Sequence, residues 1–128
     1  MTPDPIPSAD SVTYAEQVLA AKKLKKRILI VLASVLGAAQ VKAYQGEDLT
    51  SSEHIAACVK HFAAYGAGES GRDYNTVDMS ELMFRNLYLP PYRAAVEAGA
   101  VTAMSSFNDF MGIPASGSKW LLYDLLRK

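Results

Sequence analysis

Cysteine is nearly absent from the sequence, since Cys58 is the single example among 128 residues. An internal disulfide and a multi-cysteine metal site are therefore excluded. Net charge is also lacking, because 13 Lys and Arg residues balance 13 Asp and Glu residues. A dedicated nucleic-acid binder is normally basic overall, so nucleic acid is not the expected partner. What remains is ordinary globular composition: half of the residues are apolar, and the length suits one domain.

Sequence signatures of several enzyme classes are missing as well. His54 and His61 are seven residues apart, which does not match a His-x-x-x-His metal motif, and no Cys-x-x-Cys pair exists. Neither a Gly-x-x-x-x-Gly-Lys-Ser phosphate loop nor a Gly-x-Ser-x-Gly nucleophile elbow occurs. We therefore expect no metal and no cofactor. Cys58 lies in an apolar run, which predicts a buried packing residue rather than a nucleophile.

The N-terminal part predicts an extended, mobile arm over residues 1–11, which hold three of the six prolines, with Ser11 as the N-cap of a following helix. Five cations then precede the apolar residues 28–33: Lys22, Lys23, Lys25, Lys26 and Arg27. This order is similar to a secretory leader. However, the cluster starts late in the chain, no clear cleavage signature follows, and Lys42 comes soon afterwards.

We therefore favour a buried helix or strand at residues 28–33, beside a solvated basic patch, over a leader. A patch that binds anionic lipid or nucleic acid is a weaker alternative, because no aromatic residues are interleaved with the cations. The apolar run through Ala39 is interrupted by Ser34 and Gly37 and is shorter than the roughly 20 residues that span a bilayer. No membrane span is expected from it.

From residue 32 onward, helical and strand patterns alternate. Residues 32–44 have helical apolar spacing at Val35, Leu36, Ala39 and Ala43, and Gly46 is a suitable terminator. A buried strand at 55–62 comes next, followed by a long loop at 63–79. A helix capped by Ser80 then has Leu82, Met83, Leu87 and Tyr88 on its apolar face, and a second helical piece follows at 92–98. The last elements are a buried strand at 100–107, a loop with Gly112, Pro114 and Gly117, and a helix at 119–127. This order predicts an α/β fold with two or three parallel strands and flanking helices.

Polar residues follow each predicted strand. Ligands of α/β folds bind beyond the carboxyl ends of the strands, where Lys60 and His61 lie at the end of one strand and residues 104–108 at the end of the other. Lys60 donates up to three hydrogen bonds and His61 one or two, which suits a hydroxyl-rich ligand. The alternative is a Lys60 that merely reaches solvent and a half-buried His61 with its hydrogen bonds already made. The loop carboxylates Glu69, Asp73 and Asp78 are more typical of turns than of acid–base catalysis.

Four segments carry a family resemblance: SVLGAAQVKAYQGEDL, AACVKHFAAYGAGESGRDYNTVDMSE, YLPPYRAAVEAGA and MSSFNDFMGIPASGSKWLLYDLLRK. In this order they closely resemble bacterial glycoside hydrolase family 3, the β-glucosidase and β-xylosidase family. The resemblance covers residues 32–128 and implies part of a (β/α)8 TIM barrel, a fold of about 250 residues. Residues 1–31 do not resemble the family, so we expect two parts: an unmatched N-terminal arm at 1–31 and a partial barrel domain at 32–128.

The resemblance also implies roles for particular residues. Lys60 and His61 match the pair that hydrogen-bonds hydroxyls of the terminal sugar. Met104 and Phe107 match pocket-lining positions, and because the second is often Tyr, one hydroxyl contact is lost. Arg72 matches the loop at the pocket rim, with its neighbours Asp73 and Tyr74. The chain departs from the family at Met111, Ser118 and Tyr123, where Asn, Asn and Thr are common.

Family members are retaining enzymes, which need a carboxylate nucleophile and an acid/base about 5 Å apart. The family's nucleophile is an Asp in a Ser-Asp-Trp or Ser-Asp-His sequence on the next strand, and the chain ends at Lys128, before that strand. The acid/base comes from further on. The resemblance thus implies a β-glycosidase fragment that binds part of a β-linked glucoside or xyloside, has no catalytic residue of its own and is inactive alone.

A different class of function stays open on the sequence. The chain would then be a self-standing interaction module in which residues 1–31 cover the sheet. For the β-glycosidase fragment, in contrast, the sheet is open, and we expect its exposed strand edges to promote self-association. Relatives are commonly periplasmic or secreted, but without a convincing leader we expect a cytoplasmic location for this chain as it stands.

Overall fold

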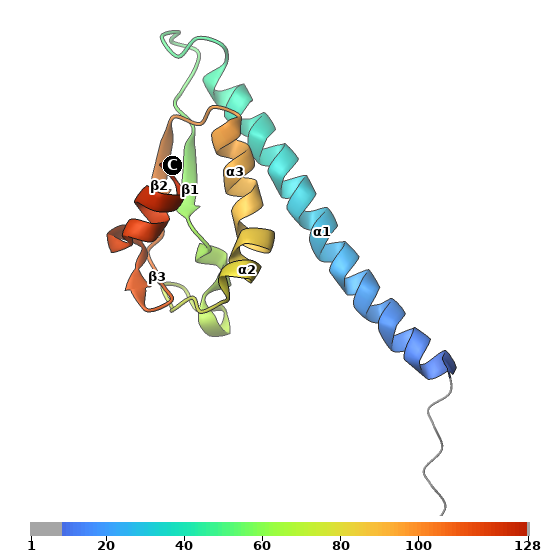
Figure 1. Ribbon diagram of the computed structural model, residues 1–128. Coiled ribbons are helices and arrows are strands. Elements are labelled where there is room, and N and C mark those ends of the chain that lie inside the picture. The colour runs from blue at the N-terminus through green and yellow to red at the C-terminus, as the bar shows by residue number, and fades with distance from the viewer. Residues whose placement is uncertain (1–8, 128) are drawn as a thin grey trace, which may run out of the picture.

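A computed structural model describes residues 9–127 of the chain, with their side chains from Lys22 onward. It begins with one helix of 37 residues, α1 (Ala9–Gln45), which packs against α3 and continues past the rest of the described chain (Figure 1). The other elements are β1 (Cys58–Phe62), α2 (Glu81–Met83), the π-helical turn η3 (Phe84–Tyr88), α3 (Leu89–Glu97), β2 (Thr102–Ser105), β3 (Asp109–Phe110), β4 (Ile113–Pro114) and the π-helical segment η5 (Trp120–Leu125).

The start of α1 differs from the sequence expectation. The helix already includes residues 9–11, so Ser11 lies inside α1 and is not its N-cap. Residues 1–8 of the predicted arm lie outside the described residues. The predicted helix at 32–44 is present, but it is the last third of α1 rather than a separate element. It ends as predicted: Gly46 has a φ of 55°, and its N–H donates to the Lys42 carbonyl over 2.9 Å.

Burial of residues 28–33 was predicted wrongly. Their helix is present, but Ile28, Leu29 and Val31 are exposed, and only Ile30 is half-buried. The reason is that α1 contacts the body of the protein through another face, at Ile30, Ser34, Gly37, Val41 and Gln45. Residues 22–29 are also exposed rather than packed over the sheet, contrary to the interaction-module alternative.

The sheet consists of β1 and β2 paired in parallel, with Cys58 opposite Thr102 and Val59 opposite Ala103. Parallel pairing was predicted and is confirmed. Burial of both strands on both faces is wrong, because helices cover only one face: Val59 packs with Val41 of α1 and Ala95 of α3. On β2, Thr102, Ala103 and Met104 are exposed, and Cys58 is exposed as well rather than buried.

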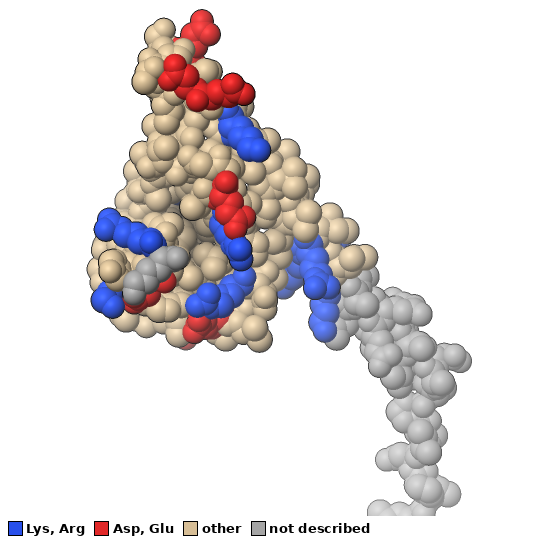
Figure 2. Space-filling view, turned by 45° about the horizontal axis from the view of Figure 1, so that its top comes forward, with Lys and Arg blue, Asp and Glu red and all other residues tan. Residues whose placement is uncertain are grey.

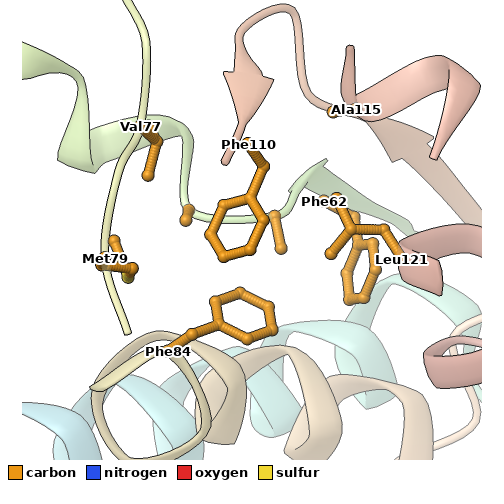
Figure 3. Packing of buried hydrophobic residues seen from close by; sticks show 9 residues of the cluster. Phe62, Val77, Met79, Phe84, Phe110, Ala115 and Leu121 are labelled. Carbon is orange, nitrogen blue, oxygen red and sulfur yellow. The ribbon is translucent and has the colours of Figure 1, made fainter. Parts of the chain in front are cut away.

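A second, larger core surrounds the carboxyl end of β1. Its buried members are Phe62, Ala63, Ala64, Val77, Met79, Phe84, Phe110, Ala115 and Leu121 (Figure 3). Rings of three segments meet there: the centroids of Phe84 and Phe110 are 4.9 Å apart, and Trp120 stacks on Phe110 at 6.0 Å. This core joins η3, the loop before α2 and η5, so it places the segments that surround the end of β1.

The helical segment after Ser80 was predicted with the right start, and its apolar face was predicted correctly in part. Tyr88 packs against the core and Leu87 is half-buried, but Leu82 and Met83 are exposed. Ser80 is the N-cap, and its Oγ accepts a hydrogen bond from the Met83 N–H. Leu82 is 71% exposed, whereas Phe84 is fully buried. The π-helical turn η3 follows α2 directly and carries Phe84 into the core. The last predicted helix is also present, as the segment containing η5, with Leu121 buried.

A short hairpin occupies the predicted loop that contains Gly112. β3 and β4 pair antiparallel, with Phe110 opposite Ile113, so that Met111 and Gly112 form a two-residue turn. Both turn residues have positive φ, 53° for Met111 and 78° for Gly112. This is the type I′ arrangement, for which Asn-Gly is the favoured pair. Methionine is therefore poorly suited to position 111.

We expect Met111→Asn to stabilise the protein. Left-handed backbone costs most L-residues roughly 1–2 kcal/mol and Asn less, so a gain of about 1 kcal/mol in the free energy of unfolding is predicted. Urea denaturation of both proteins measures it. Met111→Ala is the matched control, because it removes the thioether and keeps an unsuitable residue at positive φ. A Met111→Asn protein no more stable than Met111→Ala would contradict this account of the turn.

Candidate functional site at the carboxyl ends of the strands

Lys60 and His61 lie at the carboxyl end of β1, as predicted. Lys60 is exposed and His61 is half-buried. The backbone around them is held from two sides: the Tyr92 hydroxyl of α3 donates to the His61 carbonyl over 2.7 Å, and the Ser106 N–H donates to the Phe62 carbonyl over 2.7 Å. The peptide bonds Lys60–His61 and Phe62–Ala63 are cis. Both neighbouring elements thus position the end of this strand.

The His61 side chain is surrounded by rings instead of hydrogen-bond partners. Its ring centroid is 4.9 Å from that of Tyr65 and 5.0 Å from that of Phe107, and Tyr74 lies 5.6 Å from Phe107. We call these four residues the ring cluster. Among the described side chains, which start at Lys22, neither the His61 ring nitrogens nor the Lys60 ammonium group has a hydrogen-bond or ion-pair partner. The alternative of a histidine whose bonds are already made is therefore not what the structure shows.

Tyr65 connects the ring cluster to the long loop. Its hydroxyl donates to the Asp73 carboxylate, and this hydrogen bond, more than partial desolvation, raises the pKa of Tyr65 to about 12. Tyr65 therefore remains a neutral donor throughout the physiological pH range. The Asp73 oxygen that receives this bond is engaged with the loop itself, which fits the sequence interpretation of the loop carboxylates as structural.

Hydrogen bonds to backbone carbonyl groups hold the loop from residue 65 to 76 closed. The Glu69 N–H donates to the Thr76 carbonyl over 3.0 Å, and the Asn75 side-chain amide donates to the Glu69 carbonyl over 3.1 Å. Gly68 is required for this closure, since a Cβ there would lie 2.8 Å from the Arg72 carbonyl oxygen. Arg72 sits at the turn with an exposed side chain that has no polar partner in the described part of the chain.

The predicted site residues are thus brought together unequally. His61 and Phe107 are in direct ring contact, and Lys60 precedes His61 on the same strand. Met104 lies on the neighbouring strand β2, partly exposed, and Arg72 is on the loop joined to the cluster through Tyr65. Asn108 does not take part, because its side chain is buried and donates to the Asp109 carbonyl.

Sequence reasoning missed three residues here. Tyr65 is part of the ring cluster, Tyr92 holds the His61 carbonyl, and Ser106 holds both the Phe62 and the Ala63 carbonyls. The signal available in the sequence for Tyr65 was its position directly after the predicted strand. Tyr92 gave no such signal, because its contact joins segments 31 residues apart. Among the side chains that the structure describes, from Lys22 to Arg127, no group of three His, Cys, Asp or Glu is placed to hold a metal ion.

Comparison with known proteins identifies the family. The model of the glycosyl hydrolase family 3 N-terminal domain matches residues 30–128. The chain belongs to this family. Family 3 membership was predicted from the four sequence segments and is confirmed.

Two curated relatives illustrate the similarity. A periplasmic β-glucosidase of Salmonella typhimurium is 47% identical over 96 residues, and a β-xylosidase of Formosa agariphila is 40% identical over 99 residues. Each alignment covers 75% of this chain. The chain spans only 12% and 14% of the length of these family 3 relatives, respectively.

Solved family 3 structures agree with the fold. A β-glucosidase from Listeria innocua superposes with a TM-score of 0.71 and 54% sequence identity, covering 73% of this chain and 13% of that one. The same enzyme has been solved in complex with glucose and with gluconolactone. An exo-1,3/1,4-β-glucanase from Pseudoalteromonas superposes with a TM-score of 0.72 at 28% identity, covering 77% of this chain and 13% of that one. The α/β fold with its parallel strand pair is therefore that of β-glycosidases.

Proposed function

We propose that residues 32–128 are one part of a (β/α)8 barrel of a retaining β-glycosidase, and that Lys60 and His61 bind hydroxyls of the terminal sugar. Residues 1–31 lie outside this part in sequence, although α1 runs across the boundary. The observation that carries this proposal is the pair of polar side chains at the end of β1, which have no partner within the described part of the chain and lie beside the exposed rings of Phe107 and Tyr74. Sugar sites combine a few directed donors with apolar ring faces in this way.

A cleft along β1 supports the barrel assignment. It has a volume of about 440 Å³ and lies between α1, β1 and α3, and its lining includes four successive residues of the β1 segment, from Ala57 to Lys60. Successive residues alternate between the faces of a strand, so a cleft that touches all four follows the strand's edge. This edge is the one that β2 leaves unpaired. A further parallel strand paired with this edge of β1 would extend the sheet toward a barrel. Where the edge stays unpaired, we expect it to promote self-association of the chain.

The substrate class follows from the relatives. Both curated relatives named above act on β-linked glucose or xylose according to their names, and the Listeria innocua β-glucosidase binds glucose. We assign the same β-glucosides or β-xylosides to this site. Met104 and Phe107 then line the sugar pocket and Arg72 lies at its rim. Phe107 offers a ring face without a hydroxyl group, so contact there is by packing alone.

Binding of glucose to the purified chain tests the sugar assignment. We expect saturation-transfer NMR to show saturable glucose binding, and His61→Ala or Lys60→Ala to weaken it about tenfold or more, because each change removes a charge-assisted or directed hydrogen bond. His54→Ala and Lys42→Ala are matched controls, since both residues lie outside the strand ends. An equal loss in the His54→Ala control, or no saturable binding by the unsubstituted chain, would refute the assignment.

The proposal assigns the nucleophile and the acid/base of the retaining reaction to residues outside Met1–Lys128. We therefore expect the 128-residue polypeptide to show no turnover of an aryl β-glucoside above the buffer rate, because glycosyl transfer to a carboxylate is the chemical step itself. Release of the chromophore, followed by absorbance, measures it. Turnover above background that His61→Ala abolishes would show that this polypeptide holds its own catalytic carboxylates.

A further inference from the structure

An exposed apolar stripe runs along α1 on a face that the rest of the protein does not use. It consists of Leu24, Ile28, Val31, Leu32 and Val35, each at least half exposed. Their spacing of i, i+4, i+7, i+8 and i+11 places them on one side of a helix. Four of them, with Arg27, line a hollow in the surface. The face that packs on the body is a different one, with Ile30, Ser34, Gly37, Val41 and Gln45.

Cations lie beside and opposite this stripe. Lys22, Lys23, Lys25, Lys26 and Arg27 are all exposed. At 3.6 residues per turn, Lys22, Lys23 and Lys26 project from the side of the helix opposite the stripe, and Lys25 and Arg27 flank it. No acidic residue occurs between Glu16 and Glu47. Figure 2 shows Lys and Arg side chains on the exposed part of α1, next to the grey residues.

We propose that this part of α1 binds an anionic lipid bilayer, with the stripe at the boundary of the acyl chains and the cations at the headgroups. An amphipathic helix with a cationic polar face lies in the membrane interface in this manner. The apolar stripe and the neighbouring cations then have one explanation. A nucleic acid would account for the cations but not for the stripe. A second copy of the chain would account for the stripe but not for the five exposed cations.

The helix lies on the membrane rather than crossing it. By length and composition, Lys22–Gln45 is long and apolar enough to span a bilayer, with a mean hydropathy of 1.5 in an 18-residue window of it. However, the last turns of this helix pack against the rest of the protein. Val41 is buried against Val59 and Ala95, and the Gln45 side chain bonds to Ala57, Gly99 and Val101. Crossing the bilayer would break these contacts, whereas lying on its surface leaves them intact.

Vesicle flotation of the full 128-residue chain tests the proposal. We expect the chain to float with vesicles of phosphatidylcholine containing about 30% phosphatidylglycerol, to float far less with phosphatidylcholine alone, and to be released by high salt. The double variant Lys23→Glu/Lys26→Glu and the stripe variant Ile28→Glu are each expected to weaken binding about tenfold or more. Leu82→Glu is the matched control, because Leu82 is an exposed leucine on α2 and should not matter.

Three outcomes would overturn the proposal. One is flotation that is equal on neutral and anionic vesicles, or that Ile28→Glu leaves unchanged. Another is retention of the bound chain by the vesicles after both high salt and alkaline extraction, which would mean that the helix spans the bilayer. The last is no flotation together with a dimer that Ile28→Glu converts to a monomer, which would make a second copy the occupant of the stripe. Circular dichroism of each variant checks that α1 is still helical.

Discussion

Replacement of Gln45 by leucine is expected to lower the free energy of unfolding by about 3 kcal/mol, since each buried backbone group left without a partner costs about 1–3 kcal/mol. The Gln45 amide accepts hydrogen bonds from the N–H groups of Ala57 and Val101, both over 3.1 Å, and donates to the Gly99 carbonyl over 2.8 Å. It thereby joins the end of α1 to the starts of both strands. Leucine has a similar size but makes none of these bonds.

The control for this change is Gln40→Leu on the same helix. Gln40 is exposed, so its replacement is expected to change the free energy of unfolding by less than about 0.5 kcal/mol. Urea denaturation followed by circular dichroism measures both variants. The Ala57 bond is buried, whereas the other two are partly open to solvent, so the loss is expected to come mainly from Ala57. Equal stability of the two variants would mean that the Gln45 bonds contribute nothing.

Truncation of Phe84 to alanine is expected to cost about 3–5 kcal/mol, the usual range for a fully buried aromatic ring. Its ring contacts Phe110 at 4.9 Å and Trp120 at 5.8 Å, and its side chain is inaccessible to solvent. A loss of this size approaches the whole stability of a typical small domain, about 5–15 kcal/mol. The variant should therefore unfold at much lower urea concentration, or not fold.

Leu82→Ala provides the contrast, because Leu82 was one of the four residues that the sequence placed on the apolar face of this helix. Leu82 is 71% exposed, and its truncation is expected to cost less than about 0.5 kcal/mol. Thermal and urea unfolding of the two variants, measured side by side, decide which residue holds this helix to the core. If Leu82→Ala were the more damaging change, the π-helical turn at Phe84 would be misplaced.

Local signals made several elements predictable from the sequence. Ser80 capped its helix and Gly46 ended α1, because cap and terminator positions depend on the backbone of a few neighbouring residues. The two strands and their parallel pairing were also predictable, since short apolar runs separated by a helix allow few other connections. The position of Lys60 and His61 followed from the same topology.

Burial was not predictable in the same way, because it depends on which surfaces meet. Ile28 and Val35 are apolar residues of the kind usually found in a core, but α1 packs against the body of the protein through Val41 and Gln45 instead. Cys58 lies on the uncovered side of the sheet. The turn at Met111 was missed because methionine rarely occupies a position with positive φ, and the residues that favour such turns are Asn, Asp and Gly.

The site was predictable to the extent that it follows from the strand ends. The ring contacts of Tyr65 and the Tyr92 hydrogen bond to the His61 carbonyl join residues from different elements, so no local pattern indicated them. Among the described side chains, the ring cluster also leaves His61 without a hydrogen-bond partner, which the sequence left undecided. The proposal that His61 binds the sugar rests on this feature.

A chemical-shift map of the ¹⁵N-labelled chain during titration with glucose tests the account's central claim most directly. We expect the largest shifts at the strand ends and the ring cluster: Lys60, His61, Tyr65, Arg72, Met104 and Phe107. The cleft between α1, β1 and α3 provides an internal comparison, since Val41, Tyr44 and Ala57 line it near the start of β1 rather than its carboxyl end. Shifts concentrated at these three residues, or no saturable shift at His61, would contradict the claim that this end of the sheet holds the sugar.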